Sequence, residues 1–117
     1  MLERTEVAIL LDYYGKLLTK RQREVMAAYY EDDLSLAEIA ENLGISRPGV
    51  HDLLRRALSQ LRSLEDQLGL AARDRHRRES ISRIKSLIAK LAKTDLSTAA
   101  RSDLDVLMAE VAKLEQI

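Results

Sequence analysis

The stretch SLAEIAENLGISRPGVHDLLRR, residues 35–56, decides the predicted fold of this chain. It begins with Ser35 and Glu38 at the spacing of a capping box, which predicts the start of a short helix. Gly44 then supplies the left-handed residue that a tight turn between two helices needs. Ser46 can cap a second helix directly after the turn. The pattern predicts two helices joined by a three-residue turn.

The residues where these two helices would touch match a helix–turn–helix. The crossing point needs a small side chain, and Ala40 stands there. The turn needs an apolar plug, which Ile45 supplies. The second helix should bury the fifth and eighth residues after that plug, Val50 and Leu53. Because helices that cross steeply through a short turn touch at few positions, this agreement favours a helix–turn–helix over a plain helical bundle.

Two further helices are predicted before the motif. The first covers residues 3–14, where apolar residues repeat at spacings of three and four. The second begins at a capping box formed by Thr19 and Gln22. The last helix of the motif keeps an apolar seam until Gly69. We therefore predict a helix–turn–helix nucleic-acid-binding domain over residues 1–69.

Residues 70–117 are predicted to form a helical extension. Two apolar seams lie there, on either side of a break at residues 93–95. The seams consist of Ile81, Ile84, Ile88 and Leu91, and of Leu104, Leu107, Val111 and Leu114. Their spacing predicts an antiparallel hairpin. Each seam covers only about two heptads, so it needs the other seam, the first domain or a second chain for stability. We expect the hairpin to support a homodimer.

The composition agrees with an all-α protein and argues against several functional classes. The 117 residues include one Pro and four Gly, too few for a turn-rich β fold. No run approaches the roughly 20 apolar residues of a membrane span, and the first residues lack a signal-peptide pattern. Without cysteine, thiolate metal sites and disulfides are excluded, and a cytoplasmic location is expected. No catalytic, metal-binding or cofactor-binding pattern is present, so we expect no enzyme, metal or cofactor.

The charges are unevenly distributed although the net charge is zero. Residues 1–46 hold five Lys or Arg and nine Asp or Glu, a net charge of −4. Residues 47–78 hold eight basic and four acidic residues, a net charge of +4. The basic segment begins where the second helix of the motif begins, as expected for a surface that faces phosphates. The alternative is a solvated charged face.

The segment from about Leu2 to Leu70 resembles the YlxM family, small bacterial helix–turn–helix proteins encoded beside components of the signal recognition particle. The matching features are Asp12-Tyr13-Tyr14-Gly15, Leu17-Leu18-Thr19, Gln22-Arg23, Tyr29-Tyr30, Asp33-Leu34-Ser35-Leu36, Glu38-Ile39-Ala40, Ile45-Ser46-Arg47, Val50 and Asp52. The segments LTKRQREVM and RRALSQLR are more distantly similar to region 4 of bacterial sigma factors. The resemblance implies a DNA-binding regulatory protein connected with the signal recognition particle pathway.

The sequence departs from this family at the start of the second helix of the motif. Where the family usually has Arg-Gln-Ala-Val-Tyr-Asp, residues 47–52 read Arg-Pro-Gly-Val-His-Asp. A Gln side chain can hydrogen-bond to a base edge, whereas Pro48 and Gly49 offer no side-chain donor. The arginines that remain suit phosphates, which position a protein on DNA without reading its sequence. We therefore expect weak sequence specificity.

The residues that we predict to contact nucleic acid come from two basic groups. They are Arg47, His51, Asp52, Arg55, Arg56, Arg62, Arg73, Arg75, Arg77 and Arg78. Asp52 would repel phosphate unless it accepts from a cytosine or pairs with Arg55 or Arg56 on its own helix. His51 is either a contact or an exposed residue without a role. The cluster at residues 73–78 either extends the footprint, including to the backbone of structured RNA, or is a solvated helix start.

Three functional hypotheses follow. The first is a non-enzymatic regulatory protein that binds nucleic acid, with duplex DNA as the expected partner, RNA as the alternative, and a homodimer presenting two recognition helices. The second is a scaffold that binds the RNA or protein components of the signal recognition particle and modulates its assembly. The third is a structural helical oligomer, which would leave the capping boxes and the motif spacing unused.

Overall fold

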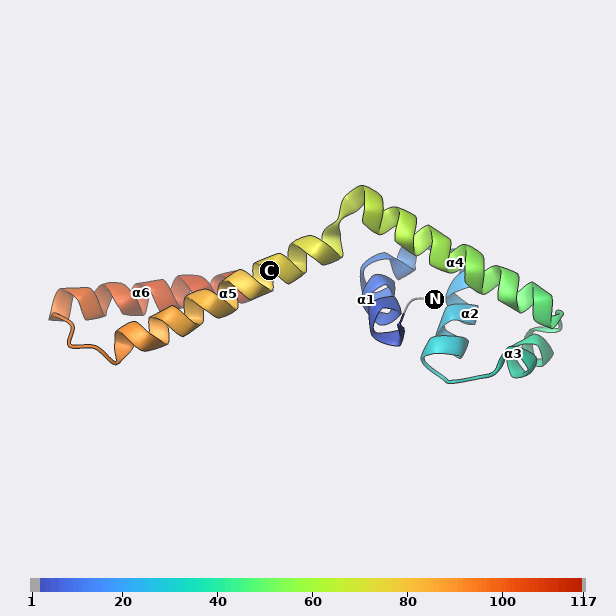
Figure 1. Ribbon diagram of the computed structural model, residues 1–117, viewed down its shortest axis with the longest axis horizontal. Helices are drawn as coiled ribbons and strands as arrows, with labels where there is room; N and C mark the ends of the chain where they lie inside the picture. Colours follow the sequence, from blue (N-terminus) through green and yellow to red (C-terminus); the bar gives the residue numbers. More distant parts are fainter. Residues whose placement is uncertain (1–2, 117) are drawn as a thin grey trace. The chain divides into compact units, whose positions relative to one another are not determined.

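The computed structural model describes residues 3–116, and every regular element in this range is a helix (Figure 1). The elements are α1 (Arg4–Tyr14), the short 3-10 helix η1 (Gly15–Leu17), α2 (Lys20–Tyr30), α3 (Leu36–Leu43), α4 (Arg47–Leu68), α5 (Leu70–Ala92) and α6 (Thr98–Glu115). The prediction of an all-α fold is confirmed. Within the described range, no helix combines the length and apolar character that crossing a membrane requires.

The predicted capping residues start the helices of the motif. At α2, the Gln22 backbone N–H donates to Thr19 Oγ1 at 3.2 Å, and the Gln22 side chain accepts from the Thr19 N–H at 3.0 Å. Ser35 and Glu38 form the same reciprocal pair at the start of α3. These bonds satisfy N–H groups that have no partner inside their helix. Both capping boxes are confirmed.

The turn between α3 and α4 has the predicted glycine geometry. Gly44 adopts the left-handed conformation with φ of 67°, which a residue with a side chain adopts at a cost. The chain then reverses so that the Ile45 N–H donates to the Ala40 carbonyl at 3.1 Å. Ser46 caps α4 by accepting from the Gly49 N–H at 3.1 Å. The turn therefore fixes the direction in which α4 begins.

The chain divides into two compact units, Met1–Ala71 and Ala72–Ile117. In the first unit, α4 packs against α1, α2 and α3. The core of this unit consists of Val7, Leu10, Tyr14, Leu18, Val25, Met26, Ile39, Ala40, Val50, Leu54, Ala57 and Leu61. Ala40 and Val50 are buried as predicted, whereas Leu53 is half-buried and packs against the edge of the core. The long helix α4 is thus packed along one face against three other helices.

Tyr14 connects this core to the beginning of α5. Its hydroxyl donates to Glu65 Oε1 at 2.5 Å and accepts from the Leu70 N–H at 3.1 Å. The same Glu65 oxygen accepts from the Ala71 N–H at 3.0 Å. Two backbone N–H groups in the first turn of α5 therefore bond to side chains of α1 and α4. Burial raises the pKa of the Tyr14 phenol above its ordinary value of 10, and the hydrogen bond to Glu65 acts in the same direction.

The second unit is a hairpin of α5 and α6, as the two seams predict. Ser97 caps α6 by accepting from the Ala100 N–H at 3.1 Å. Arg101 donates to the carbonyls of Ala92 and Thr94, which stabilises the connecting turn. Lys85 of α5 pairs with Glu115 of α6 at 3.2 Å. The buried residues of this unit are Ile81, Ile88, Leu104 and Val111.

The hairpin buries only half of the eight seam residues. Ile84, Leu91, Leu107 and Leu114 are 37–48% exposed. Each of these residues lies three positions after a buried one, and three residues turn a helix by about 300°, so the side chain stands beside the contact line. In this hairpin, α5 and α6 therefore bury one row of each seam.

Candidate nucleic-acid interface

The predicted phosphate contacts of the first unit lie on the solvent side of α4. Arg47, His51, Arg55, Arg56 and Arg62 are all exposed. Residues 47, 51, 55 and 62 are four, four and seven positions apart, so they form one strip along the helix. Because the adjoining face of α4 is fixed in the core, the strip is presented by a rigid element.

Asp52 pairs with two arginines of its own helix. Its carboxylate oxygens lie 2.7 Å from Arg55 Nη2 and 2.9 Å from Arg56 Nε. The hydrogen bond from Arg55 is the main reason why the pKa of Asp52 lies below its ordinary value of 3.8, and the charge of Arg56 acts in the same direction. The structure thus shows the intrahelical alternative for Asp52, with both arginines rather than one. The two ion pairs also hold the guanidinium groups of Arg55 and Arg56 close to the same carboxylate.

Pro48 and Gly49 have a structural role in the first turn of α4. A Cβ atom on Gly49 would lie 3.1 Å from Ser46 Oγ, the atom that caps the helix. It would also contact the side chain of Ile45, the apolar plug of the turn. Pro48 stands where the helix needs no N–H donor. These two residues shape a well-capped helix start, and neither adds a polar side chain to its surface.

The second basic group repeats the arrangement around Asp52. Asp74 lies 2.5 Å from Arg77 and 3.0 Å from Arg78, again three and four residues along the helix. The Asp74 side chain is only 14% exposed, compared with 42% for Asp52. Arg73, Arg75 and Arg78 are exposed and Arg77 is half-buried. The two groups belong to different units, so a joint footprint stays a prediction.

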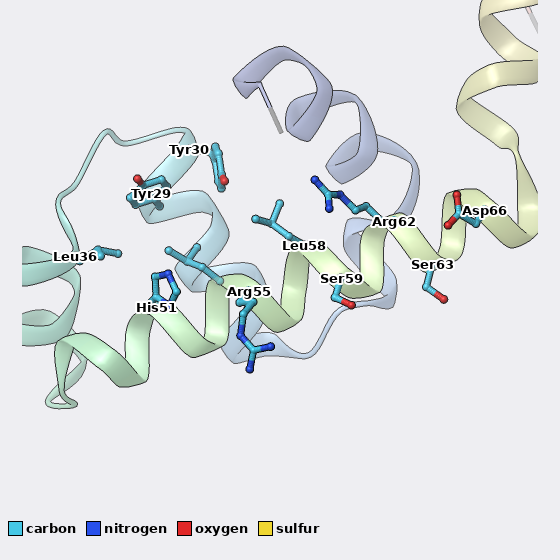
Figure 2. Close-up of a pocket in the computed structure, with 11 residues that line it drawn as sticks. Tyr29, Tyr30, Leu36, His51, Arg55, Leu58, Ser59, Arg62, Ser63 and Asp66 are labelled. Carbon is cyan, nitrogen blue, oxygen red and sulfur yellow. The ribbon is translucent and has the colours of Figure 1, made fainter. Parts of the chain in front are cut away.

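A groove of about 700 Å³ runs along α4 in the first unit (Figure 2). It is lined by Tyr29, Tyr30, Leu36, His51, Leu54, Arg55, Leu58, Ser59, Arg62, Ser63 and Asp66. Tyr29 and Tyr30 are both half-buried, whereas Tyr14 is fully buried in the core. The rings of Tyr29 and Tyr30 pack edge to face beside the groove, with 5.0 Å between the ring centroids.

Over the described residues, no group of three or more His, Asp or Glu side chains could hold a metal ion. The polar side chains of the groove are arginines, hydroxyls, one histidine and one aspartate. Together with the capped α3–turn–α4 geometry, these side chains suit the binding of anionic groups.

The chain matches a protein family described as "Putative helix-turn-helix protein, YlxM / p13 like" over residues 1–100. This chain belongs to that family. A UPF0122 protein of Symbiobacterium thermophilum is 43% identical over 96 residues, which cover 82% of this chain and 87% of the relative. A UPF0122 protein of Geobacillus kaustophilus is 44% identical over 101 residues, 86% of this chain and 92% of the relative. A UPF0122 protein of Acetivibrio thermocellus is 38% identical over 112 residues, which cover 96% of this chain and 93% of the relative.

Sequence reasoning missed three features of this surface. The groove needs the three-dimensional approach of α2 to α4, which no local pattern contains. The bond between Tyr14 and Glu65 joins residues 51 positions apart. The pairing of Asp74 was visible, because Asp-x-x-Arg-Arg occurs at both Asp52 and Asp74, and the spacing predicts an ion pair in any helix.

Proposed function

We propose that this chain is a regulatory protein that binds duplex DNA through the exposed strip of α4 and catalyses no reaction. The observation that carries the proposal is the capped α3–turn–α4 unit, with α4 fixed in the core and arginines on its outer side. A helix mounted in this way can lie against a DNA groove. The family description as a helix–turn–helix protein supports the same function.

The proposed contacts are mainly electrostatic. Arg47, Arg55 and Arg56 face phosphates, while Pro48 and Gly49 leave the helix start without base-reading groups. Binding should therefore depend steeply on salt and weakly on sequence. Two unrelated duplexes of equal length should bind with affinities within about threefold of each other, since contacts to phosphates are common to both.

A salt titration tests this function. The affinity for a fluorescein-labelled duplex is measured by anisotropy from low to moderate salt for the wild type and for Arg55→Ala. Loss of one phosphate contact should reduce the slope of log affinity against log salt by about one. Arg21→Ala is the matched control, because Arg21 is an exposed arginine of α2 outside the strip. An equal change in both variants would contradict the proposed site.

We also propose that the protein acts as a homodimer formed by the hairpin. In an antiparallel pair, residues three positions after the buried row lie on the same side of both helices. Ile84, Leu91, Leu107 and Leu114 meet this condition, and Leu87 lies beside them on α5 with 58% of its surface exposed. A second hairpin placed on this side would complete a four-helix bundle.

Light scattering tests the dimer. The wild type should have twice the chain mass of 13.3 kDa at micromolar concentration. Leu107→Glu should reduce the mass to that of one chain, because a charge cannot be buried in an apolar interface without a partner. Val106→Glu is a control on the same helix, one residue earlier and turned by about 100° away from Leu107. A monomeric wild type would remove this part of the proposal.

The connection with the signal recognition particle, which the family resemblance implies, stays a prediction. Under this alternative, the same arginine strip contacts the particle's RNA or a protein component in the cytoplasm. Binding to the particle's RNA or protein with no binding to duplex DNA at low salt would favour it over the DNA-binding function.

A further inference from the structure

The groove along α4 has an apolar inner wall that DNA binding does not use. Leu54 and Leu58 form this wall on α4, and Tyr29 and Tyr30 close it from α2. Figure 2 shows Leu58 pointing from α4 toward the side on which the tyrosines lie. The tyrosine rings meet edge to face at an angle of 74°, which holds each ring in place.

The groove extends along much of α4. Its lining begins at His51 and ends at Asp66 on this helix, a length of about 22 Å at 1.5 Å per residue. This length corresponds to about four helical turns. It suits a helical segment better than a compact small molecule.

The charged border of the groove is mainly cationic. Arg55 and Arg62 lie along it with His51, and Asp66 is the one acidic residue of its lining. Among residues 3–116, the Arg62 side chain has no ion pair and no hydrogen bond. Figure 2 shows Arg62 on the same side of α4 as Leu58, whereas Arg55 points toward the outer edge. An occupant with carboxylates beside an apolar stripe would match both the wall and the border.

We propose that this groove binds an acidic amphipathic helix of a partner protein. Apolar residues of that helix at positions i, i+3 or i+4, and i+7 would pack against Leu58 and the tyrosines. Carboxylates at the flanking positions would pair with Arg62 and contact His51. Single-stranded nucleic acid fits less well, because it needs free aromatic faces for stacking and the two rings already pack against each other.

The helix and DNA would exclude each other. His51, Arg55 and Arg62 border the groove and also belong to the strip proposed to face phosphates. A bound acidic helix would neutralise these cations and occupy space beside α4. This competition rests on the proposed DNA binding, whereas the groove's affinity for an acidic helix does not.

The test uses a fluorescein-labelled synthetic helix of about 15 residues, the length of the groove at 1.5 Å per residue. Leucines occupy one face and glutamates flank them; a second peptide has lysine at each glutamate. The glutamate peptide should bind the full-length protein at least about tenfold more tightly than the lysine peptide, a difference of about 1.4 kcal/mol. Unlabelled glutamate peptide should also displace labelled duplex DNA.

Three variants locate the binding. Leu58→Ala should weaken binding of the glutamate peptide at least about fivefold through loss of apolar contact and leave DNA affinity unchanged. Arg62→Glu should reverse the preference between the two peptides. Because the Arg62 side chain is exposed, this variant should fold like the wild type. Arg56→Ala is the matched control, since Arg56 does not line the groove; it should weaken DNA binding and leave peptide binding unchanged. Circular dichroism of each variant verifies that it is folded.

The outcomes separate this proposal from the DNA-binding function. Equal binding of the glutamate and lysine peptides by the wild type would overturn the groove proposal, as would an unchanged preference in Arg62→Glu. Peptide binding without any DNA binding would support the groove and contradict only the DNA-binding function. DNA binding without peptide binding would support the DNA-binding function and contradict the groove proposal.

Discussion

The two units of the chain use the same local signals but bury different amounts of apolar surface. Both contain long helices, Ser-capped starts and apolar residues at helical spacing. In the first unit twelve described residues form the core, and in the hairpin four do. The difference lies in the number of neighbours, because α4 contacts three other helices, whereas each hairpin helix has only one within its unit.

This difference assigns separate tasks to the two units. A helix packed against three others presents its outer residues in a fixed geometry, as the binding of nucleic acid requires. A two-helix hairpin leaves an apolar side uncovered, and association with another hairpin would cover it. The proposed binding strip lies on α4, which packs against three helices, and the proposed dimer contact lies on the uncovered side of the hairpin.

The largest expected effect tests the contrast in burial directly. Leu61 is fully buried and Leu107 is 44% exposed. In dilute solution, Leu61→Ala should lower the free energy of unfolding by about 2–5 kcal/mol, because it opens a cavity in the core. Leu107→Ala should cost less than about 1 kcal/mol, as is usual for exposed positions. Urea unfolding followed by circular dichroism measures both values.

The same pair of variants also reports on association. If the hairpin dimerises, the cost of Leu107→Ala should increase with protein concentration, because dimer formation stabilises the folded state by mass action. The cost of Leu61→Ala should stay nearly constant. Equal costs for the two variants in dilute solution would contradict the difference in burial between the units.

An intermediate effect is expected where the first unit ends. Tyr14→Phe removes the bond to Glu65 and leaves the Leu70 N–H without its acceptor. The expected loss is about 1–3 kcal/mol in the free energy of unfolding. Thermal unfolding at neutral pH measures it, and Tyr29→Phe, on a half-buried tyrosine of α2, is the control. A loss no larger than in this control would remove the role assigned to the Tyr14 hydroxyl.

Tyr14 also predicts a pH dependence. Because its pKa is raised in the folded protein, folding favours the protonated phenol. This contribution to stability is complete below pH 10, the ordinary pKa, and is lost as the pH rises toward the raised value. The wild type should therefore lose stability more steeply than Tyr14→Phe above pH 10. Parallel pH profiles for the two proteins would contradict the raised pKa.

The sequence predicted those parts of the structure that depend on neighbouring residues. The capping pairs Thr19–Gln22 and Ser35–Glu38 are local, and so is the left-handed turn at Gly44. Each is determined by residues within about one helical turn, so its spacing is readable in the chain. The family resemblance, confirmed over residues 1–100, reinforced the assignment of the motif.

Features that join distant residues were not predictable in this way. Which side of each hairpin seam is buried depends on how two helices cross, and this left Leu107 exposed. The groove requires Tyr29 of α2 to approach Leu58 of α4. The contact between Tyr14 and Glu65 depends on the complete packing of the first unit. Periodicity identifies an apolar face but not the number of neighbours that cover it.

The smallest expected effect compares the two Asp-x-x-Arg-Arg arrangements. Asp52→Asn removes a negative charge and releases Arg55 and Arg56 from their ion pairs. If these arginines contact phosphates, DNA affinity at low salt should rise by about three- to tenfold, with a steeper salt dependence. Asp74→Asn makes the same charge change beside Arg77 and Arg78 in the other unit. It should have a smaller effect on DNA affinity if the first unit carries most of the binding.

Anisotropy with the same labelled duplex measures both variants. A lower affinity for Asp52→Asn would indicate that the carboxylate accepts a hydrogen bond from a cytosine, which Asn would alter. In that case α4 reads at least one base despite Pro48 and Gly49. Equal gains for the two variants would mean that Arg77 and Arg78 contribute as much as Arg55 and Arg56, and the division of tasks between the units would not hold.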